Sequence, residues 1–119
     1  MHKACVDALH AAEDSLRPGR AIGEAFAAHA RVLDAAGHRE HRLNACGYSL
    51  GTTFAPNWMD WPMLYAGNPY VAEPGNVFFV HIIVFDAARG LAMTLGRTSE
   101  VKSGGAVPLS QADLEVRVG

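Results

Sequence analysis

A run of apolar residues at positions 77–85 is the strongest pattern in the chain. It contains no turn former and is dominated by Val, Ile and Phe, which is typical of a buried strand. Both alternating faces of this strand are apolar, and only His81 interrupts one of them, so each face needs a covering layer. Residues 86–90 provide a loop with a glycine, and residues 91–98 resume as a second strand. The pattern therefore predicts an antiparallel hairpin.

Two segments before this hairpin have helical periodicity. In residues 3–16, apolar side chains recur on one stripe, and Pro18 follows as a stop signal. In residues 21–36, a second apolar stripe includes His29 and precedes Gly37, which is placed to end a helix. A single histidine on such a stripe is more often a core residue than a ligand, and we interpret His29 in that way. We expect both helices to pack on the sheet.

Three segments between the helices and the hairpin lack a clear period. Residues 38–42, HREHR, are interpreted as a solvated connector because Gly37 argues against a helix there. Residues 46–51 contain two glycines, which permit close backbone approach and suggest a site loop. Residues 52–70 hold both tryptophans and three of the six prolines. We expect this third segment to be a long irregular loop that covers a site.

The C-terminal residues suggest two short extended segments. Residues 106–109 include a proline, which is tolerated at the edge of a sheet. In the tail, Leu114, Val116 and Val118 alternate with polar residues and predict a last short strand.

Composition restricts the classes of protein that this chain can represent. Its 119 residues, 50% apolar and 18% charged, are enough for one domain with a single small core. The formal net charge is -2 and no basic run occurs, so we expect no nucleic-acid or anionic-membrane partner. Apolar runs are far shorter than the roughly 18 residues of a membrane span, and no signal pattern is visible. We therefore expect a cytoplasmic protein.

The two cysteines do not form a recognisable motif. Cys5 and Cys46 lie far apart and have no CxxC spacing, so neither a disulfide framework nor a structural zinc site is expected. We interpret both as buried free thiols.

Several motifs, taken in chain order, resemble one family. The segments RPGRAIGEAF, GYSLG, EPGNVFFVH and LGRTSEVKSGGAVPLS are similar to the C-terminal half of the catalytic domain in the creatinase, prolidase and aminopeptidase P superfamily. This resemblance extends from the first helix to Ser110. It implies an α+β fold, in which two helices pack on a curved antiparallel sheet, as half of a pita-bread domain. It also implies that residues 1–119 form a single unit, the second half of that domain.

The same resemblance places three residues where metal-dependent members have ligands. Tyr48 stands in place of a histidine in a Gly-His-Gly-Ile-Gly type segment, His81 in place of a glutamate, and Gly96 in place of a last glutamate. With these ligands lost, a two-metal site cannot form, and we expect no metal and no other cofactor.

Metal-independent relatives of the creatinase and ectoine-hydrolase kind cleave carbon–nitrogen bonds, and the chain resembles this branch. In such a site His81 could act as a general base near neutral pH, while the hydroxyl of Tyr48 polarises a carbonyl group. The alternative is that Tyr48 and His81 only hydrogen-bond each other or the backbone in a vacated metal site.

Two hypotheses about function remain open. In the first, the chain is part of a metal-independent hydrolase acting on an amide or amidine-like bond of a small polar substrate, which Trp58 and Trp61 help to enclose. In the second, it is a degenerate, non-catalytic half-domain that only self-associates or binds a ligand. An isolated chain would expose its sheet, so we expect it to be inactive or to form a homodimer.

Overall fold

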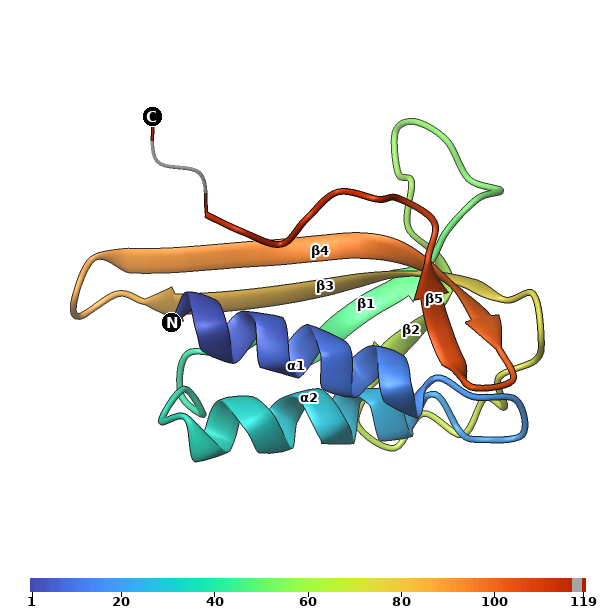
Figure 1. Cartoon of the computed structure of the whole chain (residues 1–119), viewed down its shortest axis with the longest axis horizontal. Coiled ribbons are helices and arrows are strands. Elements are labelled where there is room, and N and C mark those ends of the chain that lie inside the picture. The colour runs from blue at the N-terminus through green and yellow to red at the C-terminus, as the bar shows by residue number, and fades with distance from the viewer. Residues whose placement is uncertain (117–118) are drawn as a thin grey trace.

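The computed structural model describes residues 1–116 and 119, and its elements are labelled in Figure 1. Two helices come first in the chain, and the five strands that follow them form one sheet. The bounds are α1 His2–Ser15, α2 Gly23–Ala35, β1 Ala45–Ser49, β2 Asp60–Tyr65, β3 Val77–Asp86, β4 Leu91–Lys102 and β5 Gly105–Pro108. The α+β class, with two helices on a curled antiparallel sheet, is thereby confirmed.

The sheet has the strand order β2-β1-β3-β4-β5, and every neighbouring pair is antiparallel. At its centre is the predicted hairpin of β3 and β4, which pairs along the whole of β3. In this register His81 lies directly opposite Gly96, and Phe79 lies opposite Thr98. Directly opposed residues share a face of the sheet, so the register fixes which side chains can meet.

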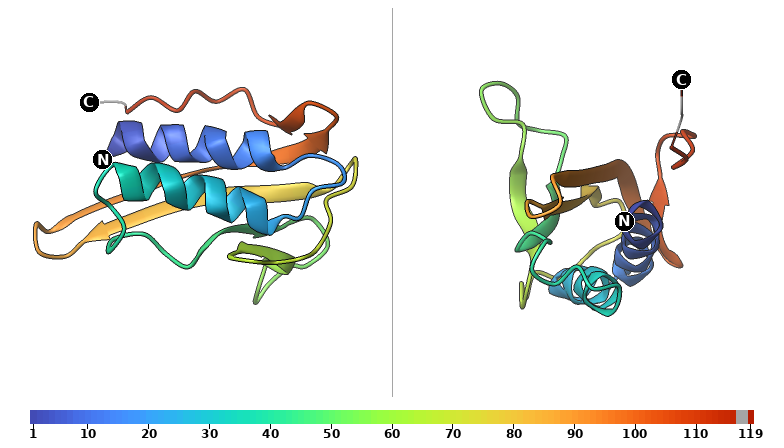
Figure 2. Two further views of the ribbon diagram at one scale, coloured as in Figure 1. Left: turned by 90° about the horizontal axis from the view of Figure 1, so that it is seen from below. Right: turned by 90° about the vertical axis from the view of Figure 1, so that its left-hand side faces the viewer.

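Both helices lie on the same side of the sheet, as the two views of Figure 2 show. The predicted stripe of α1 is buried, and so is the stripe of α2, including His29. From β3, the alternate side chains Phe78, Val80, Ile82 and Val84 complete this core and are at most 1% exposed. Removal of this apolar area from water is the main stabilising term of the fold.

The other face of β3 does not have the second covering layer that the sequence predicted. Its side chains Phe79, His81 and Ile83 are only half-buried, and Phe85 is 54% exposed. Within the described residues, neither helix reaches this face (Figure 2). A strand with two apolar faces therefore has one face in the core and one that is open, called the open face below.

The predicted irregular loop at residues 52–70 contains a strand, β2, which the sequence did not reveal. Pro62 lies inside it, and proline normally argues against a strand because it has no backbone N–H. Here β2 is an edge strand that pairs with β1 alone, so one side of its backbone needs no partner. Leu64 points into the core while Met63 lies on the opposite side.

The predicted last strand is also wrong over the residues that are described. Residues 110–116 form no strand, and Val118 lies outside the described residues. Instead Leu114 packs against the core, and its carbonyl oxygen is 2.7 Å from Nε2 of His2. Leu114 is thus packed on the core while Val116 is 55% exposed, and the alternation over the described residues does not correspond to a ladder of backbone hydrogen bonds.

The expected solvated connector after α2 is held more firmly than its composition suggests. Nε of Arg42 donates to the carboxylate of Asp34 at 2.6 Å, and the guanidinium group lies over the ring of Phe26. Arg42 also forms an isolated β-bridge with Val84. Its side chain is therefore largely removed from water.

A buried ion pair joins the first helix to the sheet. The guanidinium group of Arg97 donates to both carboxylate oxygens of Glu13, at 2.8 and 2.6 Å, and the hydroxyl of Ser99 donates to Glu13 at 2.6 Å. This carboxylate is therefore fully hydrogen-bonded in a buried position, as a charge there requires. The pair fixes α1 against β4.

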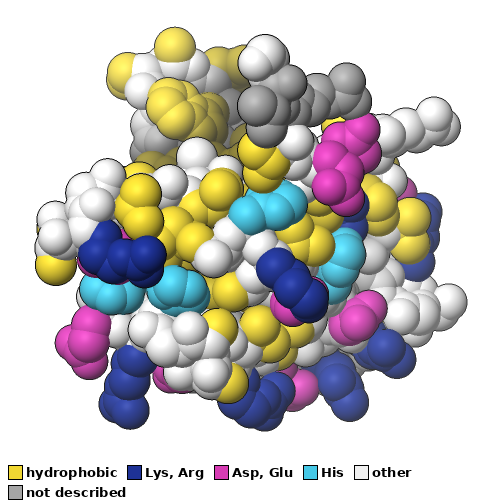
Figure 3. Space-filling view, turned by 60° about the vertical axis from the view of Figure 1, so that its left-hand side comes forward, with side chains coloured by type: hydrophobic (Ala, Val, Ile, Leu, Met, Phe, Trp, Pro, Cys, Tyr) yellow, Lys and Arg dark blue, Asp and Glu magenta, His cyan; other side chains and the backbone are white. Residues whose placement is uncertain are grey.

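Elsewhere, charged side chains of both signs are scattered over the surface. In the view of Figure 3 they alternate with hydrophobic and histidine side chains, and no large patch of one sign is present on that face. Neither described helix combines the length and apolarity needed to cross a membrane. The thiols of Cys5 and Cys46 are free and buried, as expected.

Candidate functional site

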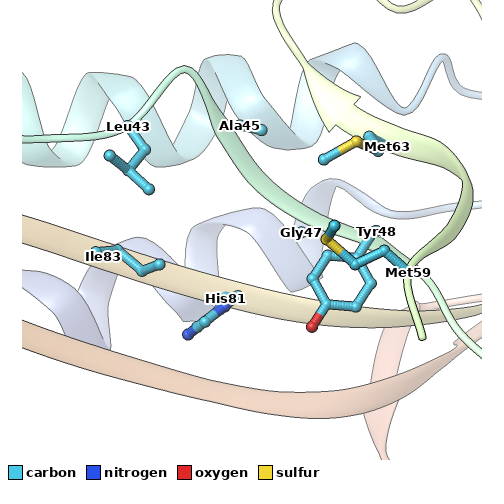
Figure 4. Close-up of a pocket in the computed structure, with 8 residues that line it drawn as sticks. All are labelled: Leu43, Ala45, Gly47, Tyr48, Met59, Met63, His81 and Ile83. Atoms are coloured by element: carbon cyan, nitrogen blue, oxygen red, sulfur yellow. The ribbon is translucent and has the colours of Figure 1, made fainter. Parts of the chain in front are cut away.

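Tyr48 and His81 are brought to one cavity on the open face. Tyr48 comes from β1 and His81 from β3, and the two strands are direct neighbours. Figure 4 shows both side chains projecting to the same side of the sheet. The cavity has a volume of about 160 Å³ and is lined by Leu43, Ala45, Gly47, Tyr48, Met59, Met63, His81 and Ile83.

The lining of this cavity is mostly apolar. Two methionines, one leucine and one isoleucine supply most of its surface, while Tyr48 and His81 supply polar side-chain atoms. None of these eight side chains is a carboxylate, an ammonium or a guanidinium group. An apolar cavity with a few polar groups is the usual form of a small-molecule site.

The ring of Phe79 links the two polar residues. Its centroid is 5.5 Å from that of Tyr48 and 5.0 Å from that of His81. The ring also lies over Gly96, where an added Cβ would come within 2.7 Å of Phe79 Cζ and 2.9 Å of the Val80 carbonyl oxygen. Glycine at position 96 therefore makes room for the aromatic ring.

His81 has a hydrogen-bond partner that the sequence did not reveal. Its Nε2 is 2.7 Å from Oγ1 of Thr94, and which atom donates depends on the tautomer. Partial burial lowers the pKa of His81 below its usual value, as the apolar neighbours along the strand predict. The ring is thus held in place and is favoured in its neutral form near pH 7.

Thr94 and Phe79 could have been found by counting residues from the hairpin loop. Once Asp86 is paired with Leu91, the register places Gly96 opposite His81 and Thr94 on the adjacent diagonal. The apolar wall of the cavity was harder to predict from the sequence, because Met59 and Met63 belong to the segment expected to be irregular.

The hydroxyl oxygen of Tyr48 accepts a hydrogen bond from Nε1 of Trp58 at 3.1 Å. This leaves the hydroxyl hydrogen of Tyr48 available for another acceptor. Gly47, the residue before it, has a φ of +151°, and a Cβ there would come within 2.4 Å of the Phe79 carbonyl oxygen. The glycine therefore permits the close pairing of β1 with β3 that sets the position of Tyr48.

The two tryptophans expected to cover the site lie in different surroundings. Trp58 contacts Tyr48 but is 59% exposed, within the segment that projects from the body of the molecule in Figure 1. Trp61 is 69% exposed and packs against Tyr65 instead, at 6.0 Å between ring centroids. Among the described residues that line the cavity, neither tryptophan occurs.

Cys46 is close to the site in sequence but is not a candidate nucleophile. Its side chain is fully buried on the core side, and burial raises the pKa of its thiol to about 12. The thiolate is the reactive form of cysteine, so this thiol is inert near neutral pH.

The arrangement of two helices on a curled antiparallel sheet recurs in solved peptidase structures. Dipeptidase PepE from Mycobacterium ulcerans superimposes with a TM-score of 0.86 at 23% identity, over 97% of this chain and 30% of that one. X-Pro aminopeptidase from Thermotoga maritima gives 0.85 at 14% identity, over 96% and 31%. The N-terminal domain of FACT complex subunit SPT16 from chickpea gives 0.77 at 18% identity, over 95% and 28%.

The sequence pattern of metallopeptidase family M24 matches residues 1–106. The chain belongs to this family. It spans about a third of the length of the solved structures it resembles, and at these identities the likeness to them concerns the fold alone. No curated protein matches the chain in sequence.

A metallopeptidase family raises the question of whether these residues could hold a metal ion. Among the described residues, no group of three or more His, Cys, Asp or Glu side chains is placed to do so. Three positions resemble ligand positions. Tyr48 supplies a phenol there, His81 supplies an imidazole that is already hydrogen-bonded to Thr94, and Gly96 has no side chain. The ring of Phe79 occupies the space beside Gly96. The described side chains at these three positions therefore do not supply the ligand set of a divalent metal.

Proposed function

We propose that the chain is the second half of the catalytic domain of a metal-independent hydrolase, which cleaves a C–N bond of an amide or amidine-like small polar substrate. The observation that carries this proposal is the meeting of Tyr48 and His81 in one cavity whose donor set does not fit a metal. Membership in the M24 family supports hydrolysis as the class of reaction. Two of the similar structures are a dipeptidase and an X-Pro aminopeptidase, which is consistent with a C–N bond as the target.

His81 is the proposed general base. In the tautomer that donates Nε2–H to Thr94, its Nδ1 keeps a lone pair that can remove a proton from an attacking water molecule. The imidazolium so formed can then deliver this proton to the leaving nitrogen as the C–N bond breaks. Partial burial lowers the pKa of His81, so the unprotonated form predominates at neutral pH. Thr94 acts as a positioning residue that holds the ring, and its hydroxyl oxygen accepts the hydrogen bond from Nε2 in this tautomer.

Tyr48 is the proposed electrophilic group. Because its oxygen accepts a hydrogen bond from Trp58, the O–H bond is free to donate to the carbonyl oxygen of the substrate. This donation stabilises the negative charge that develops on that oxygen when water attacks the carbonyl carbon. The exposed rings of Trp58 and Trp61 are proposed to close over the bound substrate.

The test uses the longest natural form of the protein with amide and amidine substrates. His81→Ala should lower kcat about 10²–10⁴-fold, which is typical for loss of a general base. Tyr48→Phe should lower kcat about 10²-fold, because one hydrogen-bond donor to the developing oxyanion is lost. His10→Ala and Tyr70→Phe, which alter exposed side chains outside the cavity, are the matched controls.

Full activity of the His81→Ala variant would remove His81 from the mechanism. Activity that is lost equally in the two control variants would indicate damage to the fold instead of loss of chemistry.

A second candidate function is favoured by the uncovered open face. This face presents Phe79, Ile83 and the exposed ring of Phe85, and such apolar surface normally has a partner. The chain would then be a non-catalytic half-domain that self-associates or binds a ligand. The similar structure from chickpea is a domain of a subunit of the FACT complex, which is consistent with this alternative.

For the isolated chain we propose a homodimer in which the open face or edge of one sheet meets that of another copy. Light scattering at micromolar concentration should give twice the mass of one chain. Phe85→Asp should shift the species toward the monomer, because a carboxylate would be buried without a partner. A monomeric unaltered chain would contradict the proposal.

A further inference from the structure

The cavity beside Tyr48 and His81 has the size of a single small ring. Its volume of about 160 Å³ is close to that of an engineered apolar cavity of roughly 150 Å³ that binds benzene. A compact molecule of about six to eight non-hydrogen atoms therefore fits it. A longer ligand would have to extend beyond the lining residues.

The cavity also lacks a counter-charge for a cationic ligand. No lining side chain is a carboxylate, and the neighbouring residues of the same face on β4, Thr94, Gly96 and Thr98, are uncharged. Transfer of an unpaired cation from water into such a site is costly.

The nearby carboxylates are engaged elsewhere. The carboxylate of Asp60 accepts hydrogen bonds from Thr52 and Thr53. That of Glu100, at the far end of the face, lies 2.6 Å from the ammonium group of Lys102. Neither carboxylate belongs to a residue that lines the cavity.

The polar atoms that remain match a neutral amide. Tyr48 can donate its O–H to a carbonyl oxygen, because Trp58 already donates to the phenol oxygen. With Nε2 of the neutral His81 ring donating to Thr94, Nδ1 keeps one lone pair, which can accept an amide N–H until an attacking water molecule replaces that N–H as the donor. One donor and one acceptor on an apolar background thus complement a secondary amide group.

We propose that this cavity binds a compact, uncharged amide and discriminates against a cationic amidine of the same shape. This inference rests on the proposed function. It narrows the substrates of that site from amides and amidines to amides alone. Specificity arises because the amidinium ion would be desolvated without a carboxylate to pair with it.

A matched pair of probes tests this selectivity. The six-membered lactam δ-valerolactam and its amidine counterpart, 2-iminopiperidine, have the same ring and heavy-atom count, but the second is protonated at pH 7. Each is titrated into the 119-residue chain while the methyl NMR signals of Met59, Met63 and Ile83 are followed. The lactam should give saturable shifts with an affinity at least ten times that of the amidine.

A pair of variants then tests the effect of a negative charge placed in the site. Leu43 lines the cavity and is 40% exposed, so its replacement should not disturb the core. Leu43→Asp should raise the affinity for the amidine at least tenfold. Leu43→Asn, whose side chain has the shape of Asp but no charge, should not. Tyr48→Phe should weaken lactam binding about tenfold, because the donor to its carbonyl oxygen is lost.

Equal or tighter binding of the amidine by the unaltered chain would overturn the inference, and so would the absence of methyl shifts with both probes. Lactam binding by a protein that hydrolyses no amide would leave the inference standing and remove the proposed function. Hydrolysis of amidines without lactam binding would overturn the inference and leave the proposed function standing.

Discussion

The two faces of β3 come from alternate residues of one strand, yet they differ in nearly every physical property. The face toward the helices consists of Phe78, Val80, Ile82 and Val84, all within the closed core. The open face carries Phe79, His81, Ile83 and Phe85, which are half-buried or exposed, and two of them, His81 and Ile83, line the cavity. The two faces are therefore similar in apolar content but differ in role, because one forms the core and the other borders the cavity.

This difference shows where the chain has room for chemistry. On the core face, close packing leaves no space beside the side chains, and each one mainly stabilises the fold. On the open face, a titratable ring is half-buried, hydrogen-bonded to Thr94 and accessible from a cavity. Four predictions test this contrast, from the largest expected effect to the smallest.

The first prediction compares two phenylalanines of β3. Phe78→Ala should lower the free energy of unfolding by about 3–5 kcal/mol, because it removes a fully buried ring and leaves a cavity. Phe85→Ala, on the open face, should lower it by less than about 1 kcal/mol. Urea unfolding followed by circular dichroism measures both values, at a protein concentration low enough for the chain to be monomeric. Equal losses at that concentration would show that the ring of Phe85 is covered within a single chain.

The second prediction concerns pH and the core face. Burial lowers the pKa of His29 from 6.5 to about 4, and its Nδ1 has no hydrogen-bond partner among the described residues. Because the folded-state pKa is the lower one, the unfolded chain binds the proton first as the pH falls. The contribution of His29 to the free energy of unfolding is therefore fully present above pH 6.5, and it declines by about 3 kcal/mol as the pH falls to 4.

The measurement is the free energy of unfolding at several values of pH between 7 and 4. His29→Leu should remove this part of the decline, whereas His10→Leu, which alters an exposed histidine of α1, should retain it. A decline that is identical in both variants would contradict the assignment to His29.

The third prediction tests the close contact between Gly96 and the ring of Phe79 on the open face. Gly96→Ala should lower stability by about 1–3 kcal/mol, because the new Cβ meets both the Phe79 ring and the Val80 carbonyl oxygen. Gly104→Ala, where an added Cβ meets no atom within 4 Å, is the matched control and should be close to neutral. Thermal unfolding compares the two. A neutral Gly96→Ala variant would indicate that Phe79 moves freely.

The fourth prediction expects no effect. Addition of Mn²⁺, Zn²⁺ or Co²⁺ should leave Tm unchanged, because a metal stabilises a protein only when it binds the folded state more tightly than the unfolded state. Elemental analysis of untagged protein should give well under one metal ion per chain. A stoichiometric, chelator-resistant metal at Tyr48 or His81 would contradict both this prediction and the proposed chemistry.

The sequence predicted the elements whose pattern is local. Both helices, their buried stripes and the hairpin of β3 and β4 follow from periodicities that span a few residues. The strand β2 was missed because Pro62 disrupts the local pattern, and only its place at the sheet edge makes proline acceptable. The tail was misread because alternation alone does not show whether a segment pairs as a strand.

By itself, the sequence determined that β3 has two apolar faces and that one carries His81, since alternation is a property of the strand alone. The resemblance of motifs added the expectation that Tyr48 would lie near it. Only the tertiary structure decided which face the helices cover, that Phe79 fills the space beside Gly96, and that Met59 and Met63 complete the cavity. The physical reason is that these contacts join residues far apart in the chain, whose meeting depends on sheet order and register rather than on local preference.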